Sequence, residues 1–358
     1  MYRNTKNVPY YVFGRGSLAQ LGDLLKPRRE AVDGPVVYFV DHFFRDHELI
    51  GRLPMEKGDQ LHFVDSSPEP EVTRIDAFKE AVSAADSRTP CCVVGIGGGN
   101  ALDTAKAVAN LLTNPGKAED YQGWELVKNP AVYKIGIPTL SGTGSECSRT
   151  CVLTNIPKNL KLGMNSDYTV YDQLLLDPDL LATVPRDQYF YTGIDTFMHC
   201  VESLQGSYRN AIIDAFSVRA VQLCEEIFLS DDMMSEENRE KMMIASYIGG
   251  MAAGNVGVIH PFSAGLGVVL HVAHGLGNCL ALNVLGDIYP KEYKQFRTMI
   301  ERQGVNLPTG ICKDLTEEQY EGLYRGCIVH EKPLTNALGP DFKQILTREN
   351  LIERYKSI

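Results

Sequence analysis

The sequence predicts an α/β N-terminal domain with a mostly parallel sheet, followed by an all-α C-terminal domain. In the first half, short β-rich runs alternate with helical segments, which is typical of parallel strands with helices on both faces of the sheet. Two of these runs lead into glycine-rich loops, at 95–99 and 138–146. After residue 185 the β-branched runs become rare and helical periodicity dominates. We therefore expect two domains, residues 1–182 and 183–358.

The β-rich runs are short and apolar, as expected of strands that are buried on both faces. They are 36–40, 61–64, 91–96 and 133–137. Helical patterns lie between them at 72–85 and 101–113. The second half shows longer helical patterns at 187–204, 210–228, 236–254 and 316–330.

The composition is that of an ordinary globular protein. The chain has 358 residues and a formal net charge of -10, which argues against nucleic acid or a membrane surface as the main partner and leaves a small molecule. No apolar stretch reaches the roughly 18 residues of a membrane span, and the N-terminus lacks the apolar segment of a signal peptide. The nine cysteines include no C-x-x-C pair, so we expect free thiols in a reducing, cytoplasmic compartment.

The first glycine-rich loop has the features of a phosphate-binding turn. Gly97, Gly98 and Gly99 follow a predicted strand and open a predicted helix, where backbone N–H groups and the helix dipole attract anions. Asn100 is expected to cap this helix, and Asp103 favours the same helix end. The alternative is a tight turn that binds nothing.

Two further features of the first half fit a dinucleotide. Asp41 directly follows the strand that ends at Val40, where a carboxylate can accept hydrogen bonds from ribose hydroxyls. The loop 138–146 is rich in hydroxyls and glycines and follows another strand. Alternatively, Asp41 is an ordinary loop residue and 138–146 is an ordinary polar turn.

A metal site is indicated in the second half. Asp195 and His199 lie four residues apart and share one face of a helix. His260 and His274 are fourteen residues apart, and a straight helix would separate them by about 21 Å. They meet at one ion only if the chain bends, which Pro261 and the glycines that follow it permit.

One carboxylate and three imidazoles suit Fe²⁺ or Zn²⁺, with a position left for substrate. His271 is a competing candidate for a metal ligand, because one helical turn would separate it from His274. We favour His271 as a residue beside the ligands rather than as a ligand.

These motifs, in this order and spacing, resemble the iron-containing (group III) alcohol dehydrogenases, and the resemblance covers nearly the whole chain. It rests on residues 13–17, 41, 97–99, 142–146, 177–180, 193–202 and 260–275. The resemblance implies a Rossmann-like dinucleotide domain, an all-helical metal domain and a cleft between them. It implies Asp195, His199, His260 and His274 as metal ligands, with NAD(P) as the second cofactor. We also expect a homodimer.

The positions that match cofactor contacts of the family form a larger set in the first half of the chain. They are Asp41, Gly97, Gly98, Gly99, Asn100, Asp103, Thr139, Leu140, Thr143, Ser145, Lys161 and Leu180. Asn100 replaces the serine that is usual in the family, and Leu140 and Ser141 replace a common Thr-Ala pair. Many members carry a histidine with a proton-relay role where this chain has Ala264, so His271 is the nominee for the catalytic relay here.

The expected reaction is oxidation of a primary alcohol to an aldehyde, with hydride transfer to NAD(P). Overall likeness within the family favours the terminal C8 hydroxyl of 3-deoxy-D-manno-octulosonate (Kdo), on the way to amino sugars of lipopolysaccharide. Thr150, Met251 and Ala264 are expected near the substrate, and Arg149 is the nominee for its carboxylate. The alternatives are a short-chain alcohol or diol dehydrogenase, a dioxygen-using oxidase, a dehydroquinate-synthase-like lyase and a non-catalytic metal-binding protein.

Overall fold

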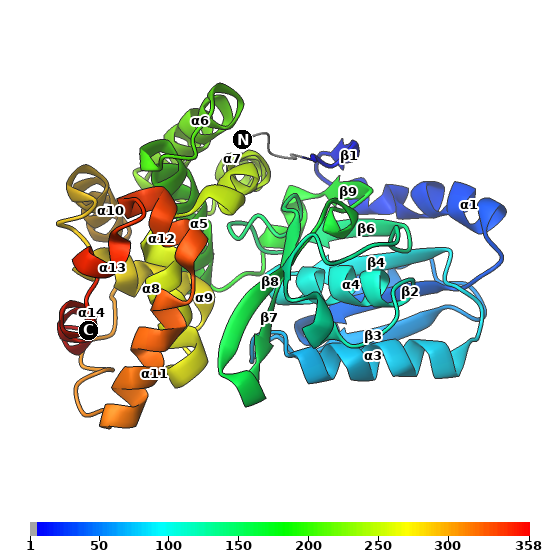
Figure 1. Ribbon diagram of the computed structural model, residues 1–358. Coiled ribbons are helices and arrows are strands. Elements are labelled where there is room, and N and C mark those ends of the chain that lie inside the picture. Colours follow the sequence, from blue (N-terminus) through cyan, green and yellow to red (C-terminus); the bar gives the residue numbers. More distant parts are fainter. Residues whose placement is uncertain (1–5) are drawn as a thin grey trace. The chain divides into compact units, whose positions relative to one another are not determined.

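The computed structural model describes residues 6–358, and the chain forms two compact units (Figure 1). The first unit comprises the residues up to 140 together with 145–158 and 162–183. The second comprises 184–358 together with two short segments, 141–144 and 159–161. The main division falls between Thr183 and Val184.

The first unit contains a six-stranded sheet in which all paired strands are parallel, in the order β1-β9-β6-β4-β2-β3. The strands are β1 (Tyr10–Phe13), β2 (Val36–Asp41), β3 (Gln60–Val64), β4 (Cys92–Gly97), β6 (Lys134–Pro138) and β9 (Gln173–Leu176). The central strands β2, β4 and β6 are almost entirely buried. The predicted parallel sheet is therefore confirmed.

Helices cover both faces of this sheet because alternate side chains of each strand point to opposite faces. Val37 and Phe39 pack in one core with α3 (Val72–Ala85) and α4 (Gly99–Leu111). Tyr38 and Val40 pack in the other core with α1 (Leu21–Ala31). Figure 1 shows α1 and α3 on opposite sides of the strands.

A second sheet has the strand order β5-β8-β7. Its strands are β5 (Gly123–Trp124), β7 (Thr150–Asn155) and β8 (Leu160–Asn165). The remaining short helices of this part are η1 (Ser17–Gln20), η2 (His42–Phe44), α2 (Glu48–Gly51), η3 (Ala118–Tyr121), η4 (Ile156–Lys158), η5 (Asp167–Thr169) and η6 (Pro178–Leu181).

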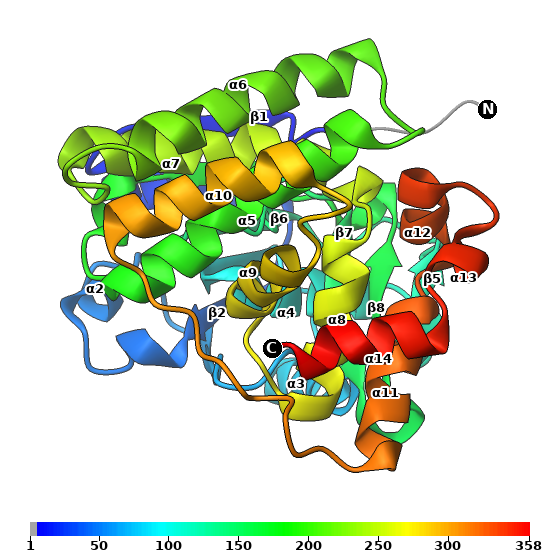
Figure 2. The same cartoon turned by 90° about the vertical axis from the view of Figure 1, so that its left-hand side faces the viewer.

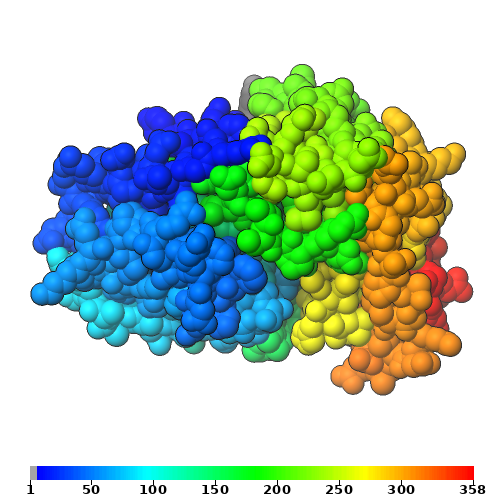
Figure 3. All heavy atoms as spheres, turned by 180° about the vertical axis from the view of Figure 1, so that it is seen from behind, coloured from blue at the N-terminus to red at the C-terminus, as the bar shows by residue number. Residues whose placement is uncertain are grey.

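From Val184 onwards the chain contains helices but no strands (Figure 2). They are α5 (Arg186–Gln205), α6 (Ala211–Phe228), α7 (Glu236–Gly249), η7 (Gly250–Asn255), α8 (Ile259–Leu270), α9 (His274–Val284), α10 (Pro290–Gln303), α11 (Glu317–Ile328), α12 (Glu331–Leu338), α13 (Phe342–Ile345) and α14 (Arg348–Lys356). The segment from α10 to the start of α11, in orange, forms a ridge on the surface of this unit (Figure 3).

Helices α8 and α11 cross closely at two glycines. A Cβ atom added to Gly326 would lie 2.9 Å from Gly265 Cα, and one added to Gly265 would lie 2.7 Å from Leu323 O. Further along, a Cβ added to Gly322 would lie 3.0 Å from Val269 Cγ2. The two helices are therefore antiparallel, and the absence of side chains at Gly265 and Gly326 allows this approach.

All nine cysteines are buried and none forms a disulfide. Among the described residues, no single helix is long and apolar enough to cross a membrane. One bent pair, 236–255 with 259–270, meets that test by length and composition.

Candidate metal centre

Helix α5 presents three buried polar side chains on one face. Asp195, His199 and Glu202 follow one another at helical spacing, and each is at most 4% exposed. Positions separated by four and three residues lie above one another on a helix. The surrounding positions of α5, such as Phe197 and Met198, are apolar and fully buried.

The bend predicted between His260 and His274 is confirmed. Helix α8 begins at Ile259 and ends at Leu270, and α9 begins at His274. His271 closes α8 in the left-handed conformation, with φ 55° and ψ 30°. This break brings His260 and His274 together although they are fourteen positions apart.

The prediction that His271 lies one helical turn from His274 is wrong, because the chain leaves the helix at His271. His271 is exposed, and the cluster of potential metal-binding side chains found among the described residues does not include it. The competing assignment of His271 as a ligand therefore has no geometric support.

The four predicted ligands converge. One ligand atom from each of Asp195, His199, His260 and His274 lies within 4.8 Å of the others. His260 Nε2 is 3.1 Å from Asp195 Oδ1, and His274 Nε2 is 3.5 Å from Asp195 Oδ2. The rings of His199 and His260 are stacked with centroids 4.4 Å apart.

Two neighbouring residues hold the ligands in place. Glu202 Oε2 is 2.5 Å from His260 Nδ1, and Glu202 Oε1 accepts a hydrogen bond from the backbone N–H of Ile259. Asn278 donates through Nδ2 to Asp195 Oδ1 at 2.7 Å. A carboxylate on the far nitrogen of a histidine fixes the ring orientation at metal sites.

Sequence reasoning gave Glu202 and Asn278 no role. Glu202 lies three residues after His199, and Asn278 lies four residues after His274. Helical spacing from a predicted ligand was therefore the available signal for both residues.

The electrostatics suit a cation. Burial lowers the pKa of His199 to about 4, so its imidazole is neutral and available as a ligand. Burial opposes ionisation of Asp195, but the neighbouring histidines hold the pKa of this carboxyl well below its usual range. Burial also opposes a charge on His260, yet Glu202 and Asp195 raise its pKa to about 9.

The donor set fits one divalent metal ion. Asp195 Oδ2 and His199 Nδ1 are buried and have no hydrogen-bond partner among the described residues. A cation beside the carboxylate would offset the cost of burying its charge. One carboxylate with three imidazoles is a donor set that suits Fe²⁺ or Zn²⁺.

In the first unit, Asp41 and the first glycine loop are neighbours. A Cβ atom added to Gly97 would lie 2.9 Å from Asp41 Cβ, and Gly97 has a φ of 151°. Asp41 ends β2 and accepts hydrogen bonds from Ser66 Oγ and from the backbone N–H of Phe43. Gly97 ends the adjacent strand β4. A carboxylate and a glycine turn thus share the carboxyl edge of the sheet, where dinucleotides bind in such folds.

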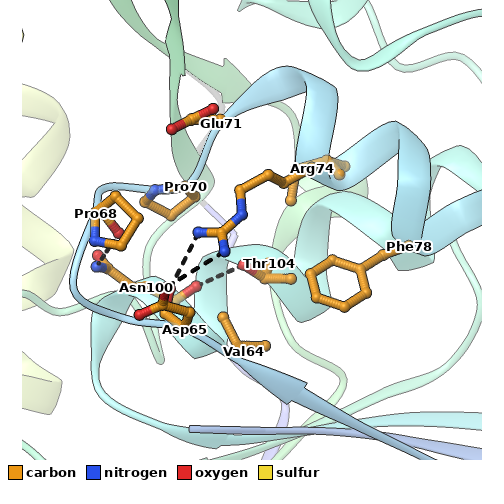
Figure 4. A pocket seen from close by; sticks show the side chains of 10 residues that line it. Val64, Asp65, Pro68, Pro70, Glu71, Arg74, Phe78, Asn100 and Thr104 are labelled. Atoms are coloured by element: carbon orange, nitrogen blue, oxygen red, sulfur yellow. Dashed lines mark hydrogen bonds and ion pairs between the residues drawn. The ribbon is translucent and has the colours of Figure 1, made fainter. Parts of the chain in front are cut away.

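One detail of the first glycine loop was predicted wrongly, because Asn100 does not cap α4. Gly98 is the residue that precedes α4, and no side chain caps this helix end. Asn100 instead donates to the backbone oxygens of Ser66 and Pro68, at the pocket shown in Figure 4. Asp103 uses both carboxylate oxygens within the protein, because one accepts from Ser145 Oγ and the other from the backbone N–H of Val152.

The other predicted cofactor positions are divided between the units. Thr139 is buried and donates its backbone N–H to Gly97 O, and Leu140 packs on Gly98. Leu180 is buried in the core of the first unit. Thr143 and Lys161 belong to the second unit.

The residues expected near the substrate have different surroundings. Arg149 forms ion pairs with Glu125 and with Asp167, which already neutralise its charge. Ala264 lies on α8 one turn after His260 and is 7% exposed. Thr150 begins β7, and Met251 lies in η7.

Comparisons with known proteins give a consistent picture. Residues 9–178 match the family model described as iron-containing alcohol dehydrogenase, and residues 189–322 match the model of its C-terminal part. NAD-dependent methanol dehydrogenase from Bacillus methanolicus is 30% identical over 278 residues, which cover 75% of this chain and 71% of that protein. Sulfoacetaldehyde reductase from Bilophila wadsworthia is 34% identical over 220 residues, which cover 60% of this chain and 56% of the reductase.

Solved structures show the same fold. An alcohol dehydrogenase from Oenococcus oeni superposes with a TM-score of 0.83 at 21% identity and covers 99% of both chains. Sulfoacetaldehyde reductase from Bifidobacterium kashiwanohense, in complex with NAD+, gives a TM-score of 0.80 at 24% identity and covers 99% of this chain and 98% of its own.

Proposed function

Because the chain belongs to the iron-containing alcohol dehydrogenase family, we propose that it interconverts a primary alcohol and its aldehyde, with a nicotinamide dinucleotide as hydride carrier. The observation that carries this proposal is the convergence of Asp195, His199, His260 and His274 in the second unit. The first unit supplies the parallel sheet and the glycine turn that such a dinucleotide requires.

We assign Asp195, His199, His260 and His274 as the metal ligands. A divalent ion bound by them would lower the pKa of a substrate hydroxyl towards neutrality. Glu202 orients the ring of His260, and Asn278 fixes the carboxylate of Asp195.

We assign Asp41 to the adenosine ribose, with NAD as the preferred dinucleotide. Its carboxylate lies at the carboxyl end of β2 beside Gly97, where it can accept hydrogen bonds from a 2′-hydroxyl and would repel a 2′-phosphate. The methanol dehydrogenase of Bacillus methanolicus is described as NAD-dependent, which supports this assignment.

For the substrate, we propose the C8 hydroxyl of Kdo as the leading candidate. The small side chain of Ala264, one turn from His260, supports a substrate larger than a short alcohol. The relatives act, by their names, on sulfoacetaldehyde and methanol, so small alcohols and aldehydes are the second candidate class.

The test is NAD reduction, followed by absorbance, in enzyme of measured metal content, with Kdo and 1-propanol as substrates. We expect turnover that is abolished by a chelator and restored by Fe²⁺ or Zn²⁺, and a higher kcat/KM for Kdo than for 1-propanol. A kcat/KM ratio near or below one would remove Kdo and leave the dehydrogenase. Peroxide formation without a nicotinamide requirement would indicate an oxidase, and turnover of a cyclising phosphate ester without net redox change would indicate a lyase.

A further inference from the structure

His330 has a buried nitrogen that the fold leaves unused. It directly precedes α12, and its Nε2 atom is buried without a hydrogen-bond partner among residues 6–358. Leaving a buried polar atom unpaired costs free energy, so such an atom in a folded protein calls for an explanation.

The crossing of α8 and α11 places His330 beside the metal centre. Gly322 lies against Val269, and Gly326 lies against Gly265. Each four-residue step forward on α11 therefore matches a four-residue step backward on α8. His330 lies two residues beyond the end of α11, but Val329 between them keeps helical backbone angles, with φ -65° and ψ -21°, so one more step brings residue 330 near residue 261. Residue 261 follows His260, whose charge lowers the pKa of His330.

A positive charge lies along the same helix. Lys161 is 7% exposed, and its Nζ would be 3.7 Å from a Cβ atom added to Gly267. His260, Ala264 and Gly267 follow one another at helical spacing and share one face of α8. Between the His260 ring and the Lys161 ammonium, this face carries only the methyl group of Ala264 and no side chain at Gly267. The positive charge of Lys161 also lowers the pKa of His330.

We propose that His330 and Lys161 form a subsite for an oxyanion, so that the preferred substrate is an alcohol or aldehyde that carries a carboxylate or sulfonate group. Burial and the nearby positive charges lower the pKa of His330 to about 4, so the ring is neutral and its Nε2–H donates a hydrogen bond to the oxyanion. Lys161 supplies the opposite charge. Arg149, with its two carboxylate partners, is not needed for this role.

This inference rests on the proposed function and names the substrate class for the same site. Its test compares 2-hydroxyethanesulfonate with 1-propanol, a neutral alcohol of similar size, as the ratio of their kcat/KM values. The variants are His330→Leu, which keeps bulk but removes the donor, and His330→Gln, which keeps an N–H donor. His47→Leu is the matched control, because this half-buried histidine belongs to the first unit, where its ring accepts a hydrogen bond from the backbone N–H of Leu49 and lies against the rings of Phe43 and Phe44.

We expect the wild type and His47→Leu to favour the sulfonate. His330→Leu should lower the sulfonate-to-propanol ratio by about tenfold or more, the effect of one lost hydrogen bond to a charged group, and His330→Gln should recover part of it. Equal ratios in the wild type and His330→Leu, with equal metal content, would overturn the subsite. Kdo is measured in the same variants to distinguish a short from a long anionic substrate. In His330→Leu, the kcat/KM ratio to 1-propanol should fall only for the substrate whose anion reaches His330.

A binding measurement separates this inference from the proposed function. Ethanesulfonate has no hydroxyl to oxidise, so its binding to metal-loaded protein can be measured by calorimetry even if no alcohol is turned over. We expect His330→Leu to weaken this binding by about tenfold. Unchanged binding would reject the subsite, whereas weakened binding without any NAD-linked turnover would reject only the dehydrogenase reaction.

Discussion

His274 is the candidate ligand that distinguishes the metal site from its alternative at His271. We expect His274→Ala to lower the metal content of the purified protein sharply, because the ion would lose one of four ligands. His271→Ala should keep metal near the wild-type level, since this side chain is exposed and outside the cluster. Elemental analysis by mass spectrometry measures both; metal loss in the His271 variant but not in the His274 variant would show that the assignment is reversed.

Asp41 carries the prediction on cofactor choice. Asp41→Gly removes the carboxylate that would repel a 2′-phosphate, so the ratio of kcat/KM for NAD to that for NADP should fall by about tenfold, as expected for loss of a hydrogen bond to a charged group. Ser66→Ala is the control, because it removes the hydroxyl that donates to Asp41 but keeps the charge. Unchanged cofactor preference in Asp41→Gly would show that this carboxylate does not contact the ribose.

At individual residues, the sequence was informative where spacing and residue type acted together. Asp195 and His199 are readable from helical spacing, whereas His260 and His274 required a bend that only glycine and proline content indicated. His271 was misplaced because helical periodicity extends through the break that the backbone makes there. Asn100 was misread as a cap because its partners, the carbonyl oxygens of Ser66 and Pro68, lie more than thirty residues away.

Among the helices, the α8–α11 crossing is the contact most sensitive to substitution. Gly326→Ala would bring a methyl group 2.9 Å from Gly265 Cα. Such overpacking destabilises a protein by about 1–3 kcal/mol. The higher helix propensity of alanine offsets about 1 kcal/mol of this loss. Thermal or urea unfolding should therefore show a destabilised variant. Gly254→Ala is the control, since nothing lies within 4 Å of its added Cβ. An equally small change in the free energy of unfolding of both variants would mean that α8 and α11 can move apart without cost.

Elements with a strong periodic pattern were predicted well, and short or interrupted elements were not. The run 72–85 coincides with α3, and the four predicted strands lie within two residues of β2, β3, β4 and β6 at their ends. Five strands were missed. Strands β1, β5 and β9 have at most four residues each, whereas β7 and β8 have six residues each and alternate buried with partly exposed positions for most of their length. The helix predicted over 236–254 ends at Gly249 and continues as η7, a change that apolar periodicity does not signal.

For the whole molecule, the two units should respond to different ligands. A ligand that binds only the folded state stabilises it by RT ln(1 + [L]/Kd), about 4 kcal/mol at a thousandfold excess over Kd. Removing the metal should therefore lower hydrogen-exchange protection in α5, α8 and α9, which carry the candidate ligands. Adding NAD to the metal-free protein should raise protection around β2 and the start of α4. Loss of protection in the sheet but not in these helices after chelation would contradict the metal assignment.

Because all nine cysteines are buried, their reaction with a thiol reagent can report where the protein unfolds. Cys91, Cys92, Cys147 and Cys151 lie in the first unit, and Cys200, Cys224, Cys279, Cys312 and Cys327 lie in the second. Burial raises the pKa of several of these thiols, that of Cys200 to about 12, and the thiolate is the form that reacts. Alkylation must therefore wait for a local or global unfolding event. The order in which a maleimide labels these thiols, read by mass spectrometry in the unmodified sequence, records which unit opens first.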